Sequence, residues 1–161
     1  MKGSLLTITL LATASLAACA SSQAVRTSAD TMIIQTSAAP ACGANGAAKV
    51  AQAMAAIETI RAGYDAYIIL DAASANNVQV SQGPGTVYTS GTVTYSGNYG
   101  TYNGTSTYQP GPTIISGSHD QSFAIQMFKA GQPGAERAIP ARDVLGPDWA
   151  TLVKEGVNSC L

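Results

Sequence analysis

Apolar residues recur at helical spacing between residues 46 and 62. The positions three or four apart are aliphatic, and they are Val50, Met54, Ile57 and Ile60. Alanines share their side, whereas Lys49 and Glu58 fall on the other. This period predicts an amphipathic helix from Gly46 to Ala62, with Asn45 as its N-cap and Gly63 as its C-cap.

Other stretches have the patterns of strands. The β-branched run Thr31–Thr36 predicts a first strand. The continuous apolar run Tyr64–Leu70 follows the helix and predicts a central strand covered on both faces. Polar residues at Asp71–Asn77 predict a turn, after which Val78–Val80 begins a strand antiparallel to the previous one. Gln121–Phe128 alternates, with Phe123, Ile125 and Met127 on one face, and predicts a strand that can lie at a sheet edge.

Near the C-terminus, two short helical segments are expected. Ala141–Leu145 forms the first, and Pro147 and Asp148 begin the second, whose apolar face carries Trp149, Leu152 and Val153. The order of elements predicts an α+β fold, in which helices cover one face of a small antiparallel or mixed sheet.

A low-complexity insertion, residues 82–118, consists almost wholly of Gly, Ser, Thr, Tyr, Val, Asn and Pro and has no charged residue. Its aliphatic surface is too small to offset ordering entropy, so a long, disordered polar loop is expected. Alternation at Thr86–Tyr88 and Thr92–Tyr95 also permits a mobile hairpin. Tyrosine gives large contact area at low entropic cost, so the loop is a candidate interaction surface through five tyrosines. They are Tyr88, Tyr95, Tyr99, Tyr102 and Tyr108.

The N-terminus has the anatomy of a secretory signal peptide, residues 1–18. Lys2 supplies the charge, Leu5–Leu16 is apolar, and small residues precede Cys19. The sequence Leu16-Ala17-Ala18-Cys19 resembles the lipobox of bacterial lipoproteins, which implies cleavage before Cys19 and lipidation, palmitate included, of its thiol. The alternatives are an ordinary signal peptide in which Cys19 is incidental, and a transmembrane anchor, for which the run is too short.

The resemblance implies an exported, lipid-anchored protein. Ala20 follows the cysteine where an aspartate would retain lipoproteins of enteric bacteria in the inner membrane, which points to the outer membrane facing the periplasm. Residues 19–30 are Ser/Ala-rich and are expected to be a flexible tether. Residues 31–161 are then one domain.

A second resemblance is carried by the helix that leads directly into an aliphatic strand. The segment Ile60-Arg61-Ala62-Gly63-Tyr64-Asp65-Ala66-Tyr67-Ile68-Ile69-Leu70 is similar to small envelope proteins around the Rcs stress-sensor lipoprotein. That sensor has two disulfides, whereas this chain can make one. The resemblance implies fold and compartment only.

Three cysteines are present, and lipidation of Cys19 leaves Cys42 and Cys160 as a pair. Disulfides persist in an oxidising compartment, so a Cys42–Cys160 bridge is predicted. Closing so long a loop stabilises by about 4–5 kcal/mol in the chain-entropy model. The alternatives are two buried thiols or a redox pair, although no C-x-x-C motif is present.

Composition excludes several functions for this chain of 161 residues, in which 11% are charged and the net charge is −1. No basic patch suits nucleic acid, and no ligand spacing predicts a metal or cofactor site.

The leading hypothesis is a non-enzymatic envelope module that binds another envelope protein through the insertion or a sheet edge. The alternative is a small periplasmic hydrolase or redox enzyme that uses Ser118, His119 and Asp120, or the pair of Cys42 and Cys160. A small-ligand or peptidoglycan-binding module is a third possibility. Because strand neighbours point to opposite faces, the adjacency of His119 and Asp120 does not make a catalytic relay.

Overall fold

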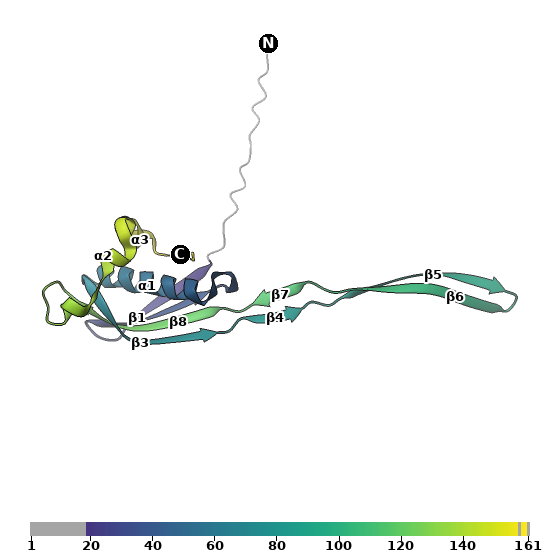
Figure 1. The fold of residues 1–161 in the computed structure, drawn as a ribbon, viewed down its shortest axis with the longest axis horizontal. Coiled ribbons are helices and arrows are strands. Elements are labelled where there is room, and N and C mark those ends of the chain that lie inside the picture. The colour runs from purple at the N-terminus through teal and green to yellow at the C-terminus, as the bar shows by residue number, and fades with distance from the viewer. Residues whose placement is uncertain (1–18, 158, 161) are drawn as a thin grey trace, which may run out of the picture.

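The computed structural model describes residues 19–157 and 159–160, and the predicted signal peptide lies outside them. A five-stranded sheet has the order β1-β2-β8-β3-β9, and all its pairings are antiparallel. Helix α1 (Gly43–Arg61) lies along one face of this sheet (Figure 1). The strands are β1 (Ala20–Arg26), β2 (Thr31–Ala38), β3 (Ala66–Asn76), β8 (His119–Phe128) and β9 (Ile139–Pro140). The predicted α+β fold is confirmed.

Strand β2 and strand β8 show the alternation that their sequences predict. Every second residue of β2 from Met32 to Ala38 is buried, as are Phe123, Ile125 and Met127 of β8. These side chains face α1, because a pleated strand directs alternate residues to opposite faces. Strand β8 lies between β2 and β3, so it is a central strand and does not take the edge position that its alternation allows.

The segment expected to be a flexible tether is instead the first strand. Strand β1 pairs with β2 along its whole length, from Ala20 opposite Ala38 to Arg26 opposite Met32. Ala20 is only 4% exposed. The chain therefore enters the sheet directly after Cys19, with no linker between them.

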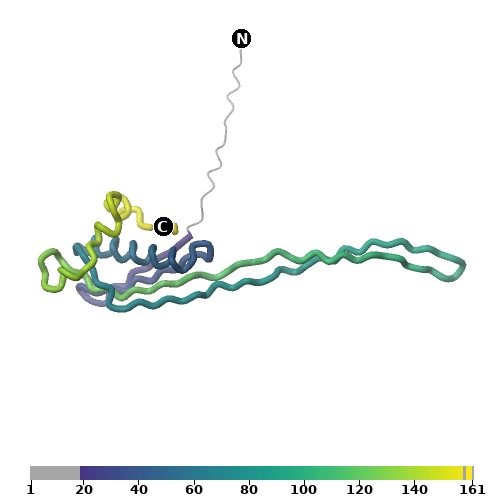
Figure 2. Tube along the Cα trace, viewed as in Figure 1, coloured from purple at the N-terminus to yellow at the C-terminus, as the bar shows by residue number. Residues whose placement is uncertain are grey.

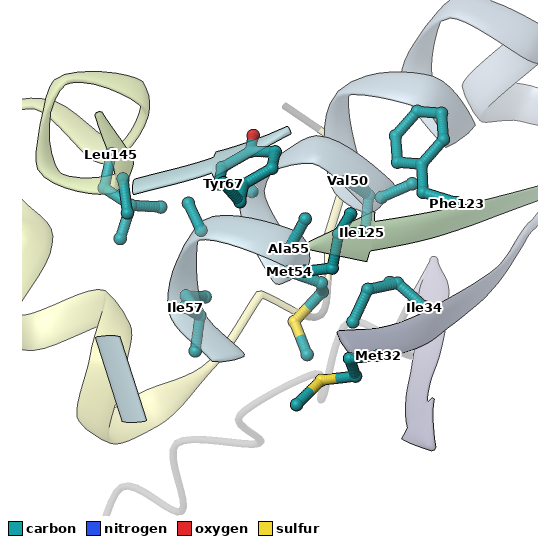
Figure 3. Close-up of a cluster of buried hydrophobic side chains, with 14 of the residues drawn as sticks. Met32, Ile34, Val50, Met54, Ala55, Ile57, Tyr67, Phe123, Ile125 and Leu145 are labelled. Atoms are coloured by element: carbon teal, nitrogen blue, oxygen red, sulfur yellow. The ribbon is translucent and has the colours of Figure 1, made fainter. Parts of the chain in front are cut away.

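Helix α1 is covered on two sides. Its aliphatic residues face the sheet and form the core with Ile34, Ile125 and Tyr67, as Figure 3 shows. Ala51, Ala55 and Thr59 on other sides of the helix are also fully buried. The elements packed near them are α2 (Ala141–Leu145) and α3 (Trp149–Glu155), joined by the 3₁₀ turn η3 (Gly146–Asp148). Alanine allows this close approach from both sides, because its side chain is small.

Strand β3 extends well beyond the core. It continues to Asn76 through the segment expected to be a turn, with a bulge between Ile69 and Asp71. Its first two residues are buried and the next two are partly buried, whereas Leu70 is 58% exposed and every later residue of the strand is exposed. The predictions of a turn at Asp71–Asn77 and of burial on both faces are therefore wrong.

The predicted disordered loop is a long two-stranded hairpin, which we call the ribbon (residues 79–116). It consists of the pair β4 (Gln79–Gln82) and β7 (Thr113–Ser116) and the pair β5 (Thr86–Ser96) and β6 (Tyr99–Gln109). The ribbon projects from the end of the sheet in line with β3 and β8 (Figures 1 and 2). The strand expected at Val78–Val80 therefore pairs with β7 and not with β3.

The strand pairing is interrupted at two places. One break separates the ribbon from the five-stranded sheet, and the other separates the β4/β7 pair from the β5/β6 pair. At the first, the Asn77 N–H donates to Ser118 O at 2.9 Å, beside Gly117, whose φ is +96°. At the second, Gly83 and Pro84 face Gly111 and Pro112, and the Gly83 N–H donates to Pro112 O at 2.8 Å. Proline has no N–H to donate, so the ladder is interrupted there.

The C-terminal part completes the cover of α1. The 3₁₀ turn η2 (Ala135–Arg137) precedes β9, and the predicted helical turn at Ala141–Leu145 is confirmed as α2. A further 3₁₀ turn, η1 (Pro40–Cys42), leads into α1. Within the described residues, no helix is both long enough and apolar enough to cross a membrane.

Candidate functional site

The two faces of the ribbon differ in character. Residues directly opposite in an antiparallel pair share a face, so the register assigns every side chain of β5 and β6. One face, the Val/Tyr face, carries Val87, Val93, Tyr95, Tyr102 and Tyr108 together with Thr89, Gly91, Gly100, Gly104 and Ser106. The other, the Thr/Ser face, carries Tyr88, Tyr99, Asn103 and Gln109 among eight serines and threonines. The ribbon is therefore amphipathic.

Three tyrosine side chains of the Val/Tyr face lie against glycine. A Cβ added at Gly91 would lie 2.5 Å from three atoms of the Tyr102 side chain, and one at Gly104 would meet the same side chain. A Cβ at Gly100 would be 3.2 Å from Tyr95, and one at Gly85 would meet Tyr108. The glycines thus leave room for aromatic rings to lie across the strands, an arrangement known to stabilise glycine-containing sheets.

The ribbon has no charged residue and two open edges. No Asp, Glu, Lys or Arg occurs from Ala72 to Ser118. The large side chains of both faces are exposed, from 47% at Val93 to 83% at Tyr99. Each strand of β5 and β6 pairs on one side only. Since proteins normally protect edges with charge, proline or cover, this ribbon has the features of a binding surface.

Sequence reasoning grouped five tyrosines into one surface, and the register separates them. Tyr95, Tyr102 and Tyr108 share the Val/Tyr face, whereas Tyr88 and Tyr99 lie on the Thr/Ser face. The spacing of glycines between the two strands was the overlooked signal. These glycines lie on the same face as Tyr95, Tyr102 and Tyr108 and so mark that face, whereas the alternation of Thr and Tyr alone does not distinguish the two faces.

Cys19 lies at the end of the sheet from which the ribbon emerges. Ala20 pairs with Ala38, Ala38 pairs with His119, and His119 pairs with Asn76, in one row across four strands. Asn76 is the last residue of β3 and His119 is the first residue of β8, so the two lie at the base of the ribbon. The start of β1 and the base of the ribbon therefore share one end of the domain.

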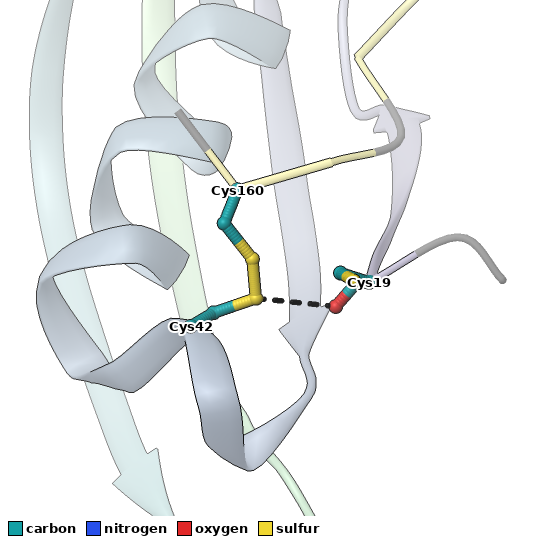
Figure 4. Close-up of a disulfide and its surroundings, with 3 residues drawn as sticks. All are labelled: Cys19, Cys42 and Cys160. Carbon is teal, nitrogen blue, oxygen red and sulfur yellow. Dashed lines mark hydrogen bonds between the residues drawn. A yellow bond between two sulfur atoms is a disulfide. The ribbon is translucent and has the colours of Figure 1, made fainter. Parts of the chain in front are cut away.

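The predicted disulfide joins Cys42, directly before α1, to Cys160, with a Cα–Cα distance of 5.6 Å (Figure 4). Cys42 Sγ lies 3.4 Å from the carbonyl oxygen of Cys19, which also accepts a 2.8 Å hydrogen bond from the Ala39 N–H. A disulfide sulfur has no hydrogen to donate, so the first approach is a packing contact. The bridge holds Cys160 beside the start of β1.

Ser118, His119 and Asp120 lie where β8 begins, but they do not converge. By alternation His119 shares the helix-covered face with Ala38, whereas Asp120 shares the outer face with Ser37. His119 Nδ1 is buried with no hydrogen-bond partner in the described part of the chain. The hydroxyls of Ser37 and then Ser118 lower the pKa of Asp120, and Asn77 Nδ2 donates to its Oδ2 at 2.6 Å. Asp120 is therefore a carboxylate with polar neighbours, although its Oδ1 is buried with no hydrogen-bond partner among the described residues.

The outer face of the sheet, away from α1, contains a shallow depression of about 460 Å³. Hydroxyl, amide and methyl groups of four strands line it, among them Ser21, Gln35, Ala73 and Ser122, and Asp120 supplies its one carboxylate. Among the described residues, no group of three or more His, Cys, Asp or Glu side chains lies close enough to hold a metal ion.

Comparison of the chain with models of protein families, with curated proteins and with solved structures finds no match.

Proposed function

We propose that this chain is a lipid-anchored protein of the cell envelope that acts by binding and not by catalysis, with the ribbon as its interaction surface. The observation that carries the proposal is the exposed, uncharged and amphipathic ribbon on a small, well-packed domain. A two-stranded hairpin is at best marginally stable alone, so one of this length gains from contact with a partner.

The anchor is proposed to be Cys19. Support comes from the apolar run and small residues that precede it, and from a disulfide, which suits an oxidising compartment. A chain anchored at Cys19 would be held at the outer membrane and face the periplasm. If Cys19→Ser still incorporates labelled palmitate and stays in the membrane fraction, the anchor is elsewhere.

The binding role is tested by photo-crosslinking in intact cells. A photoreactive residue at Tyr99 is expected to form adducts with another envelope component. The comparison variant replaces residues 78–117 with Asn-Gly and carries the photoreactive residue at Ser74, on the domain. Adducts from the domain alone, and none from the ribbon, would contradict the proposal.

Catalysis is tested separately with His119→Ala. This change is expected to leave crosslinking and membrane fractionation unchanged, because His119 belongs to the sheet, opposite Ala38 of β2, and contributes no side chain to either face of β5 and β6. A periplasmic hydrolase or redox activity lost in this variant would favour the enzyme hypothesis instead.

A further inference from the structure

We propose that the partner of the Val/Tyr face is the lipid bilayer itself, with this face in the headgroup region and the Thr/Ser face toward water. The inference rests on the proposed function only for the anchor at Cys19. It identifies the chemistry that the ribbon recognises as the boundary between lipid headgroups and acyl chains.

The position of the anchor brings the ribbon to the membrane. The apolar run Leu5–Leu16 ends just before Cys19, and β1 begins immediately after it. The row of Ala20, Ala38, His119 and Asn76 puts that point at the ribbon end of the sheet. A membrane reached from Cys19 is therefore adjacent to the base of the ribbon, with no linker to move it away.

The side chains of the ribbon suit an interface. Tyrosine is enriched where membrane meets water, since its ring is apolar and its hydroxyl is polar. Tyr108 and its partner Val87 lie at the base of the β5/β6 hairpin and Tyr95 lies at its tip, with Tyr102 and Val93 between them on the same face. The opposite face has two tyrosines, Tyr88 and Tyr99, but no valine, and its other side chains offer hydroxyl and amide groups. This division is the strand counterpart of an amphipathic interfacial helix.

The lack of charge decides which interaction holds the ribbon. No lysine or arginine from Ala72 to Ser118 can bind anionic headgroups, and no carboxylate repels them. Attachment must therefore come from burial of the valines and tyrosines. Binding is expected to be the same on neutral and anionic lipid and to be insensitive to salt, unlike that of a basic surface segment.

The backbone sets the depth. The outer edges of β5 and β6 have unpaired N–H and C=O groups, which would be costly in hydrocarbon. In the headgroup region, water and lipid esters can satisfy these groups. The ribbon is therefore placed flat on the interface and not across the bilayer.

Single tryptophan reporters test this in the full chain, reconstituted into phosphatidylcholine vesicles that contain no other protein. The only native tryptophan, Trp149, is replaced by Phe. Tyr102→Trp reports on the Val/Tyr face, and Tyr99→Trp is the matched control on the opposite face. Val87→Trp and Tyr88→Trp repeat the comparison at the base, away from the glycines that contact Tyr102.

Tyr102→Trp and Val87→Trp are expected to show blue-shifted emission, quenching by brominated lipid, and iodide quenching about threefold weaker than their partners, since their face lies in the interface. Equal iodide access on both faces, without lipid quenching, would overturn the inference. The inference would also be overturned if the Val/Tyr-face tryptophans were protected from iodide and the protein formed a dimer or larger oligomer in detergent, because a second copy of the chain would then cover this face. Neither result would affect crosslinking to an envelope protein, so the proposed function would be judged independently.

Discussion

The side chain of Tyr102 on β6 lies over Gly91 on β5, close enough that a Cβ at Gly91 would be 2.5 Å from three of its atoms. Gly91 pairs with Gly104, so the same side chain covers two glycines in adjacent strands. This contact is packing within the ribbon, in a segment that has no layer above or below it.

Gly91→Val is expected to displace this ring and to weaken the hairpin by about 1–3 kcal/mol, as overpacked positions do. Amide hydrogen exchange in β5 and β6 should therefore accelerate, while exchange in α1 stays unchanged. Ser90→Val, one residue away on the opposite face, is the matched control. Equal protection in both variants would show that the ring does not stabilise the ribbon.

Tyr67 predicts a loss of stability at alkaline pH. Its side chain is fully buried, and burial raises its pKa to about 12, against an ordinary value of 10.0. A raised pKa means that the stabilisation is complete below pH 10 and is lost as the pH rises toward 12. A rise of the pKa from 10.0 to about 12 corresponds to a loss of about 3 kcal/mol in the free energy of unfolding. Urea unfolding measured between pH 10 and pH 12 should show this decrease in the free energy of unfolding. In Tyr67→Phe the free energy of unfolding should fall less steeply with pH.

Removal of the Cys42–Cys160 bridge is expected to lower the free energy of unfolding by up to about 5 kcal/mol, because the bridge links positions 118 residues apart. The double variant Cys42→Ser/Cys160→Ser should unfold at lower urea concentration. Dithiothreitol should reproduce the effect in the parent and have none in the double variant. An unchanged urea midpoint in the double variant would mean that the bridge does not stabilise the fold and that packing of α3 is sufficient to hold this end of the chain in place.

Asp120 predicts a loss of stability in acid. Its hydroxyl neighbours, Ser37 first, hold its pKa below the usual value, so the carboxylate stabilises the fold above the pKa of the unfolded chain. This contribution disappears as the pH falls through the lower, folded pKa. The free energy of unfolding should therefore fall less between pH 6 and pH 3 in Asp120→Asn than in the parent protein. Asp71→Asn, at an exposed position of β3, provides the control.

The domain is expected to fold without its ribbon. Asn77 and Ser118 are hydrogen-bonded neighbours, and no residue between them belongs to the buried core. Replacing residues 78–117 with Asn-Gly should leave the melting temperature within a few degrees, since the turn closes a pair already in register. Calorimetry measures this, and loss of a cooperative transition would show that the ribbon supports the domain.

The core was largely predictable from residue patterns. The spacing of Val50, Met54 and Ile57 predicted α1, and alternation at Phe123, Ile125 and Met127 predicted β8, because both elements bury one side against the other. The pairing of Cys42 and Cys160 followed from the predicted compartment and from the number of cysteines. These features depend on local periodicity, which a single sequence carries.

The remaining features depend on partners distant in the chain. Strand β1 has small and polar residues without strand preference, and it is ordered by pairing with β2 and by burial of Ala20. The end of β3 has the composition of a turn because it has left the core, yet β8 continues beside it to Asn76. The ribbon lacks the aliphatic content of ordinary strands, and tyrosine over glycine replaces that packing.

The hydrogen-bonded pair of Asn77 and Ser118 is the junction between the domain and a ribbon that contributes no side chain to the buried core. Adding or deleting matched residue pairs in β5 and β6 would lengthen or shorten the projection without moving any core side chain. Homologous proteins are therefore expected to have ribbons of different lengths on closely similar domains. Alignments of such homologues should show insertions and deletions concentrated between Asn77 and Ser118.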